Sequence, residues 1–125
     1  MIRKIVDSKI LLDNIIHSIN DVKGNEVCTV DLRNLENNFC SYFVICNGTS
    51  NTHVNSIVGS IQKKISKKLK EKPFNTEGED NAEWVLIDYV DIVVHVFQKN
   101  IRDYYNLEEL WGDALITKIS IKDKK

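Results

Sequence analysis

Apolar residues return at helical spacing in two stretches of the chain, and each stretch predicts a helix. The first helix is expected to begin at Lys9 with Ser8 as its cap, and to stop at Lys23-Gly24, where a glycine suits a helix end. Its apolar positions follow i, i+3, i+4, i+7 spacing at Leu12, Ile15, Ile16 and Ile19.

The second apolar stripe is longer and follows Asn47-Gly48. Thr49, Ser50 or Asn51 could cap this helix, and Pro73 is expected to end it. Lysines crowd its last turns, where cations suit the negative end of the helix dipole. Its apolar positions are Val54, Ile57, Val58, Ile61, Ile65 and Leu69.

The other apolar runs are rich in β-branched and aromatic residues and therefore predict strands. The run 39–46 is apolar on both faces, which predicts a central strand. The runs 82–89 and 92–97 have a very short join and predict a hairpin. The run 25–32 predicts another strand, and 74–77 and 116–121 could add a short edge strand and a late strand.

Polar segments separate these elements, with a loop predicted at 33–38 and a turn at 78–81. Asn106 and Glu109 fit a capping box for a short helix that ends near Trp111. The element order predicts an α/β (α+β) fold with a single mixed sheet of about five strands and flanking helices. Residues 1–125 are expected to form one domain, which suits the length.

The composition, 42% hydrophobic and 28% charged, is that of a soluble globular protein. The chain has no apolar run near the roughly 20 residues that span a bilayer, and no signal-peptide or transit-peptide pattern. A cytoplasmic location is therefore expected. The odd set Cys28, Cys40 and Cys46 contains no CxxC pair, so we expect buried structural thiols and no zinc site.

Charge is unevenly distributed although the net charge is −1. Residues 74–113 carry two Lys or Arg against ten Asp or Glu, a net charge of −8. Such a segment either binds a basic partner or is a solvated acidic surface, and the pattern favours neither over the other.

Catalytic chemistry finds little support in the motifs. Gly48-Thr49-Ser50 lies between a predicted strand and helix, as a phosphate-binding turn would, but no nucleotide-binding glycine motif surrounds it. A nucleotidyltransferase would need paired carboxylates shortly afterwards, and the stretch 50–70 has no Asp or Glu. We therefore predict a plain strand–turn–helix junction, no enzyme activity and no cofactor.

The aspartates near the hairpin join and the histidines are expected to have structural rather than catalytic roles. Asp88 and Asp91 flank the hairpin join and are typical turn residues. The histidines His17, His53 and His95 lie in three separate elements, and His95, on the apolar hairpin, is expected to be a structural or interface residue. Six aromatics between 84 and 111 are either core or a binding surface: Trp84, Tyr89, Phe97, Tyr104, Tyr105 and Trp111.

Three ordered motifs resemble one family. They are Trp84-Val85-Leu86-Ile87-Asp88-Tyr89, then His95-Val96-Phe97, then Tyr104-Tyr105-Asn106-Leu107-Glu108-Glu109-Leu110-Trp111. Together with Gly48-Thr49-Ser50 and Glu77-Gly78 they are similar to the signature of the ribosomal silencing factor family, also called Iojap-like. The resemblance covers about residues 8–115.

This resemblance implies a nucleotidyltransferase-like topology without the catalytic site. It also implies binding to ribosomal protein fourteen of the large ribosomal subunit, which would sterically block subunit joining and repress translation under nutrient limitation. The partner-binding residues are expected on the hairpin and the segment that follows it: Trp84, Leu86, Asp88, Tyr89, His95, Phe97, Leu107, Glu108 and Trp111. Because strand alternation opposes Trp84 to Tyr89, one hairpin face should be core and the other interface.

The chain departs from the family pattern at several positions. Thr52 and His53 replace the usual Arg and Gln, Val90 replaces a glycine in the hairpin, and Asn106 replaces an acid. A β-branched residue is poorly suited to positive φ, so the turn at Val90 is expected to differ locally.

Other functions remain open at this point. Organelle members of the family imply a large-subunit assembly factor, and the Gly48 turn keeps a nucleotidyltransferase-like enzyme as a lesser alternative. The segment Lys63–Lys72 is basic and could contact ribosomal RNA peripherally, although a solvated helix end explains the same lysines. The chain is expected to be a monomer or a weak homodimer.

Overall fold

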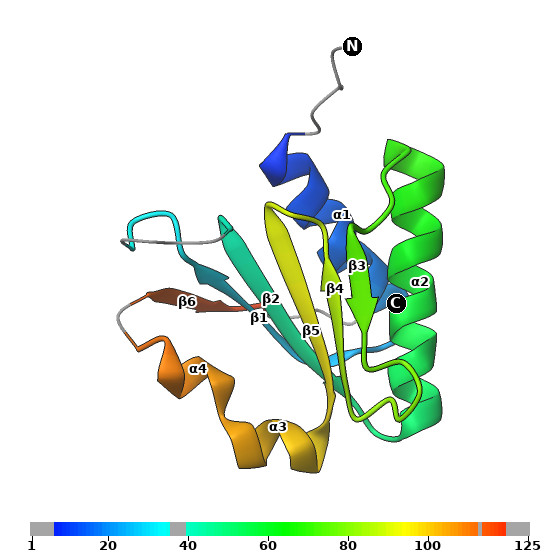
Figure 1. Cartoon of the computed structure of the whole chain (residues 1–125), viewed down its shortest axis with the longest axis vertical. Helices are drawn as coiled ribbons and strands as arrows, with labels where there is room; N and C mark the ends of the chain where they lie inside the picture. The colour runs from blue at the N-terminus through cyan, green and yellow to red at the C-terminus, as the bar shows by residue number, and fades with distance from the viewer. Residues whose placement is uncertain (1–6, 36–39, 113, 120–125) are drawn as a thin grey trace, which may run out of the picture.

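The protein is described by a computed structural model that covers residues 7–35, 40–112 and 114–119. It forms one six-stranded sheet in the order β3-β4-β5-β2-β1-β6, with α1 and α2 packed on one face and the short helices α3 and α4 on the other (Figure 1). The elements are α1 Ser8–Asp21, β1 Asn25–Asp31, β2 Tyr42–Gly48, α2 Asn51–Leu69, β3 Asn75–Glu77, β4 Trp84–Asp88, β5 Ile92–Gln98, α3 Lys99–Tyr105, α4 Leu107–Leu110 and β6 Leu115–Lys118.

The sheet is mixed because β2 and β5 run parallel at its centre, while every other described pair of neighbouring strands is antiparallel. This confirms the predicted fold class. The sheet has six strands rather than about five because the short strand β6 pairs with β1, Val30 lying opposite Ile116. The hairpin of β4 and β5, the central position of the strand that ends at Gly48, and the edge position of β3 are also confirmed.

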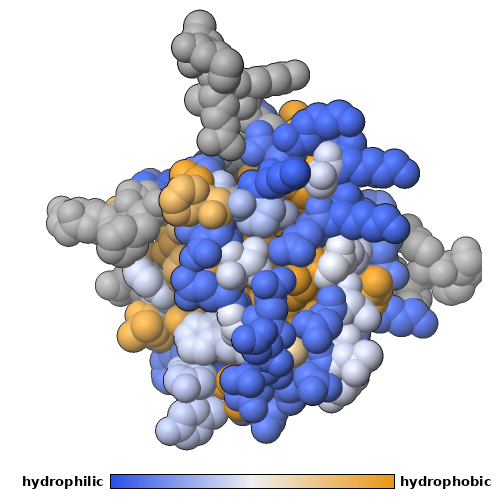
Figure 2. Space-filling view, turned by 45° about the vertical axis from the view of Figure 1, so that its right-hand side comes forward, coloured by the Kyte–Doolittle hydropathy of each residue, from blue (hydrophilic) through white to orange (hydrophobic). Residues whose placement is uncertain are grey.

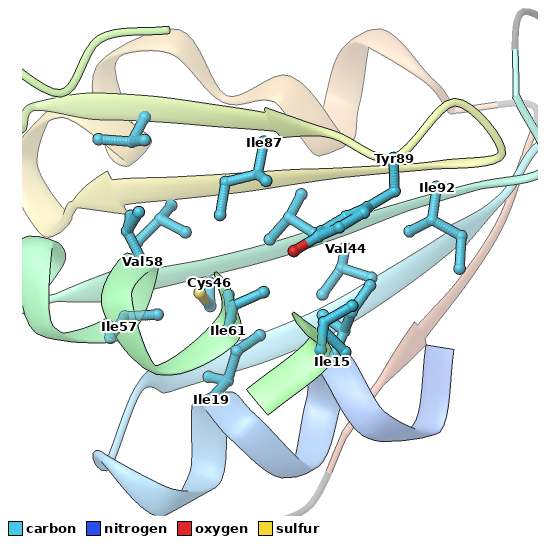
Figure 3. Close-up of a cluster of buried hydrophobic side chains, with 14 of the residues drawn as sticks. Ile15, Ile19, Val44, Cys46, Ile57, Val58, Ile61, Ile87, Tyr89 and Ile92 are labelled. Atoms are coloured by element: carbon cyan, nitrogen blue, oxygen red, sulfur yellow. The ribbon is translucent and has the colours of Figure 1, made fainter. Parts of the chain in front are cut away.

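The larger core lies between the sheet and the pair α1–α2. The helical spacing noted above brings one stripe of each helix onto the sheet, and Ile15, Ile19, Ile57, Ile61 and Ile65 are fully buried. Figure 3 shows four of them, Ile15, Ile19, Ile57 and Ile61, in one cluster with Val44 and Ile87 from the strands. Burying a side chain of this size stabilises the fold by about 1.5–3 kcal/mol relative to leaving it exposed.

The helix ends differ in detail from the predictions. Asp7, not Ser8, caps α1, and its Oδ1 accepts the Lys9 N–H at 2.7 Å. Ser8 is instead the first helical residue, and its hydroxyl donates to the Asp91 carboxylate. Ser50 caps α2 by accepting the His53 N–H at 3.1 Å.

The end of α2 also comes earlier than predicted. Lys70 takes a left-handed conformation with φ 59°, so the helix already ends at Leu69, four residues before Pro73. The left-handed residue Lys70, and not Pro73, therefore ends the helix.

The segment after β5 turns directly into α3, and Asn106, with φ 48°, separates it from α4. The predicted capping box at Asn106 is wrong. Because Asn106 ends α3 in the left-handed conformation, its side-chain amide donates to the Glu109 carboxylate at 2.8 Å and makes no cap to the backbone. The short helix nevertheless ends at Leu110, next to Trp111, as predicted.

Parts of three predictions lie outside the described residues. They are residues 36–38 of the loop, the strand start at Phe39, and positions 120 and 121 of the late strand. The thiols agree with expectation, since Cys28, Cys40 and Cys46 are all free and buried. Burial raises the pKa of Cys28 and of Cys40 to about 11, which makes both poor nucleophiles.

Candidate docking face

The sheet face opposite α1 and α2 is only partly covered. Strand register places Asp88, Val93 and Phe43 in one row across β4, β5 and β2. Leu86 and His95 lie in the next row, and Trp84 pairs with Phe97 in the one after. We define the docking face by six residues of this side that are all part-exposed: Phe43, Trp84, Leu86, Asp88, Val93 and Trp111.

Aromatic rings on and beneath this face pack against one another. The Trp84 ring stacks on Phe97 with centroids 4.8 Å apart, and Tyr105 of α3 lies 4.9 Å from it. Phe43 meets Trp111 edge to face at 5.5 Å, which links β2 to the end of α4. Such pairs add about 0.5–1.5 kcal/mol each beyond the buried area, so the ring positions are well defined in the folded chain.

His95 is buried beneath these rings and contacts two of them. Its Nδ1 accepts the Trp84 indole N–H at 3.1 Å, and its ring meets Phe43 at 4.6 Å. Accepting at Nδ1 places the proton of the neutral imidazole on Nε2. Burial lowers the pKa of His95 to about 4, so the ring is neutral at physiological pH.

A buried arginine fixes α3 and α4 beside the face. Nη1 of Arg102 donates to the Glu26 carbonyl and to Oδ1 of Asn47, both at 2.7 Å. Nε donates to the Glu108 carboxylate at 3.2 Å, and the guanidinium and carboxylate form a salt bridge. The guanidinium therefore ties α3 to β1, β2 and α4 at once.

A pocket of about 620 Å³ lies next to this arginine. Five of its six charged lining residues pair with one another: Lys99 bridges Glu26 and Asp103, and Arg102 pairs with Glu108, while Lys118 is the sixth. These pairs neutralise most of the charge that could attract a small ionic ligand.

The predicted partner-binding residues divide by burial. Trp84, Leu86, Asp88, Glu108 and Trp111 are part-exposed on the side of the docking face. His95, Phe97 and Leu107 are buried beneath it. Tyr89 belongs to the other side of the sheet, where Figure 3 shows its ring pointing into the helix-side core near Val44.

Sequence reasoning missed Phe43, Val93 and Arg102 as members of this region. Phe43 and Val93 become neighbours through the parallel pairing of β2 with β5, which a single strand pattern does not reveal. A signal for Arg102 was its position, since it is one of only two basic residues in the acidic stretch 74–113.

The turn before α2 is filled by the chain itself. His53 Nδ1 accepts the Thr49 N–H at 3.0 Å, and its Nε2 lies 2.8 Å from the Val22 carbonyl. The imidazole therefore takes up a backbone N–H of the turn that an anion could otherwise bind, and a Cβ on Gly48 would lie only 3.1 Å from the ring. Asp88 behaves as a turn residue, as predicted, by accepting the Val90 N–H at 2.7 Å.

Asp91 lies in the hairpin join, as predicted, but its carboxylate binds side chains of other elements. Its carboxylate accepts from the hydroxyls of Ser8 and Ser41, so it ties the start of α1 to the start of β2. Within residues 7–35, 40–112 and 114–119, no three His, Cys, Asp or Glu side chains gather as a metal site would require. None of the described helices is long and apolar enough to cross a membrane.

Comparison with known proteins now decides the family. A family model described as "Ribosomal silencing factor during starvation" matches residues 6–125. The chain belongs to this family of ribosomal silencing factors. The resemblance read from the motifs is thereby confirmed.

Individual relatives support the family membership. The ribosomal silencing factor of Halalkalibacterium halodurans is 38% identical over 104 residues, which cover 83% of this chain and 87% of that protein. A crystal structure from Chromobacterium violaceum is similar with a TM-score of 0.80 at 32% identity, over 86% of this chain and 88% of that one.

A more distant relative carries the name of an organelle. The mouse protein named for mitochondrial assembly of the ribosomal large subunit is 27% identical over 85% of this chain, but this match covers 47% of the mouse protein. Chloroplast proteins called Iojap are also related, which agrees with the Iojap-like motifs.

Proposed function

We propose that this silencing factor binds ribosomal protein fourteen of the large subunit through the docking face. Bound there, it sterically blocks the small subunit from joining and represses translation under nutrient limitation. Steric blocking requires only that the protein binds and occupies space, so no residue is assigned a catalytic role and no cofactor is needed. The site of action is the cytoplasm, where ribosomes assemble for translation.

The observation that carries this proposal is the exposure of aromatic and apolar side chains on a rigid sheet. Trp84 and Trp111 expose part of their rings although each packs against another aromatic. Tryptophan dominates binding energy at many interfaces, where truncating a hot-spot residue costs about 2 kcal/mol or more. A preorganised aromatic surface also loses little entropy on binding.

The acidic residues near the docking face also favour a ribosomal partner with a basic surface. Acidic residues lie on and next to the face: Asp88 is on it, Glu108 is beside it, and Glu77 of β3 lies opposite Leu86. The exposed Glu79, Asp80 and Glu83 follow in the segment that leads into β4. Such charges steer encounter with a basic surface more than they add affinity. A basic ribosomal surface is the complementary partner.

The nine expected binding residues take two roles in this proposal. Trp84, Leu86, Asp88, Glu108 and Trp111 contact the ribosomal protein directly. His95, Phe97 and Leu107 support the face from beneath, and Tyr89, on the opposite side, supports it through the stability of the hairpin.

The test is binding of the purified chain to purified large subunits and to isolated ribosomal protein fourteen, together with a subunit-joining assay. Leu86→Ala removes a part-exposed side chain of the docking face and should fold normally, whereas Trp84→Ala removes more contact area but also core packing. Both variants should bind more weakly and inhibit joining less, with intact folding confirmed by thermal unfolding. Thr52→Ala, exposed on α2, is the control. Normal binding by folded Leu86→Ala and Trp84→Ala would move the site elsewhere.

A role in large-subunit assembly is the second candidate, favoured by the name of the mouse relative. The two roles differ in what accumulates when the protein is removed. Loss of an assembly factor leaves immature large-subunit particles during growth, whereas loss of a silencing factor leaves mature subunits and excess translation in starved cells.

The basic end of α2 supports an accessory contact with ribosomal RNA. Figure 2 brings the side of α2 and β3 forward and shows a mostly hydrophilic surface. Lys64 pairs with Asp21, while the exposed lysines there are Lys63, Lys67, Lys68, Lys70 and Lys72. Replacing Lys67, Lys68 and Lys72 by glutamate should weaken binding to whole subunits and flatten its salt dependence. Binding to isolated ribosomal protein fourteen should not change.

A further inference from the structure

The turn between β4 and β5 holds a β-branched residue in a conformation that suits glycine. Val90 has φ 76°, and the Asp91 N–H donates to the Tyr89 carbonyl at 2.9 Å across it. Val90 is therefore the central residue of a γ-turn of positive φ, which is rare and strained. A side chain branched at Cβ fits this region especially poorly.

The residues on both sides impose this conformation. Tyr89 is buried in the helix-side core, and its N–H donates to the Ile92 carbonyl at 2.9 Å. Asp91 is held by Ser41, whose N–H donates to its carbonyl at 2.7 Å and whose hydroxyl donates to its carboxylate at 2.6 Å. Because both neighbours are anchored, the backbone between them cannot relax to suit a valine.

The valine side chain does not stabilise the fold in return. It is 56% exposed and belongs to neither core cluster. A glycine would make the same turn with less strain. What the valine adds is an apolar side chain presented outward at the end of the hairpin.

A second exposed apolar residue is tied to the strand end that precedes this turn. Phe74 is 78% exposed, and its N–H donates to the Asp88 carbonyl at 2.7 Å, which places it next to the end of β4. Asp88 is itself part of the docking face and caps the turn through the Val90 N–H. The pair Phe74 and Val90, which we call the hairpin end, therefore continues the docking face beyond the sheet.

We propose that the hairpin end is a contact for an apolar patch on the same large-subunit protein, and that Val90 is one of the contact residues. The inference rests on the proposed function, because the hairpin end borders the docking face and would meet the same partner. Strain at Val90 is then a cost in stability that is offset in the complex.

The decisive experiment measures stability and binding of one variant together. Val90→Gly should raise the melting temperature, because strain is relieved, and should weaken binding to purified large subunits by about three- to ten-fold, the loss expected for one partly buried apolar contact. Val90→Asn, which tolerates positive φ but is polar, should behave in the same way. Phe74→Ala should weaken binding without raising the melting temperature.

Lys23→Gly is the matched control. Lys23 is exposed and has φ 61°, so this change also relieves positive φ, but it lies in the connection between α1 and β1 and removes no part of the hairpin end. It should raise the melting temperature and leave binding unchanged.

Three results would overturn the inference. Binding by Val90→Gly within two-fold of the wild type, while Leu86→Ala binds weakly, would remove the hairpin end and keep the docking face. A lower melting temperature for Val90→Gly would show that valine serves the fold. Absence of wild-type binding to large subunits would remove this inference together with the proposed function.

Discussion

The indole N–H of Trp84 donates to the imidazole Nδ1 of His95 at 3.1 Å, across the pair of antiparallel strands β4 and β5. Trp84 is part-exposed, whereas His95 is only 4% exposed. The hydrogen bond therefore lets the buried His95 ring fix the orientation of the part-exposed Trp84 indole. It requires a neutral His95, which makes the docking face sensitive to acid.

Acid should destabilise the protein through His95. Burial lowers the pKa of His95 to about 4 in the folded chain, while an unfolded histidine has a pKa of about 6.5. As pH falls from about 6.5 to 4, the unfolded chain takes up a proton that the folded chain does not, so the free energy of unfolding falls. The contribution is fully present above about pH 6.5, and about 2 kcal/mol of it should be lost by pH 5.

Urea unfolding at pH 7 and pH 5 measures this loss. His95→Gln lacks the titrating ring, so its stability should fall less between the two pH values. Equal losses in the variant and the wild type would assign the acid sensitivity to carboxylates instead.

Removing the Arg102 side chain should loosen α3 and α4. The change leaves the part-exposed Glu108 carboxylate without its partner, which costs less than the roughly 3–5 kcal/mol of a fully buried pair. It also frees the Glu26 carbonyl and the Asn47 side chain. Chemical denaturation should report the lower stability, and amide hydrogen exchange should locate it in residues 99–110. Lys99→Ala, which removes only exposed salt bridges, should leave both measurements unchanged.

Gly59→Ala should stabilise the protein by about 0.5–1 kcal/mol. Gly59 lies within α2, is exposed, and would place a Cβ in open space. Alanine is favoured over glycine at such a position because it loses less backbone entropy on folding. Gly48→Ala is the informative contrast, since its Cβ would crowd the His53 ring and should lower the melting temperature.

Salt should slow association with the large subunit. If the acidic surface around the docking face steers the encounter, the association rate constant will fall between low and physiological salt while the dissociation rate constant changes little. Stopped-flow fluorescence of Trp84 and Trp111 can follow both rates. An association rate constant insensitive to salt would exclude steering.

The sequence predicted the elements well where one local pattern decides them. The stripe from Val54 to Leu69 specified α2, and the short join after Tyr89 specified the hairpin. The ends were harder, because Asp7 and Ser8 are both good caps and only the position of the helix on the sheet decides between them.

The docking face was predictable only in part. Alternation along β4 separated Trp84 from Tyr89, but which of the two faces the helices depends on long-range packing. Phe43 and Val93 come together only through the parallel pairing of β2 and β5, whose connection spans α2, β3 and β4. The residue pattern of one strand does not indicate which distant strand pairs with it.

The two outer strands also bear on how the protein behaves at high concentration. β3 has three residues and β6 has four, so each margin of the sheet offers few backbone groups to which another chain could add a strand. Short margins of this kind are a common protection against strand-to-strand aggregation. A protein that carries exposed aromatic rings on its sheet can therefore remain dispersed until the ring-bearing surface meets its partner.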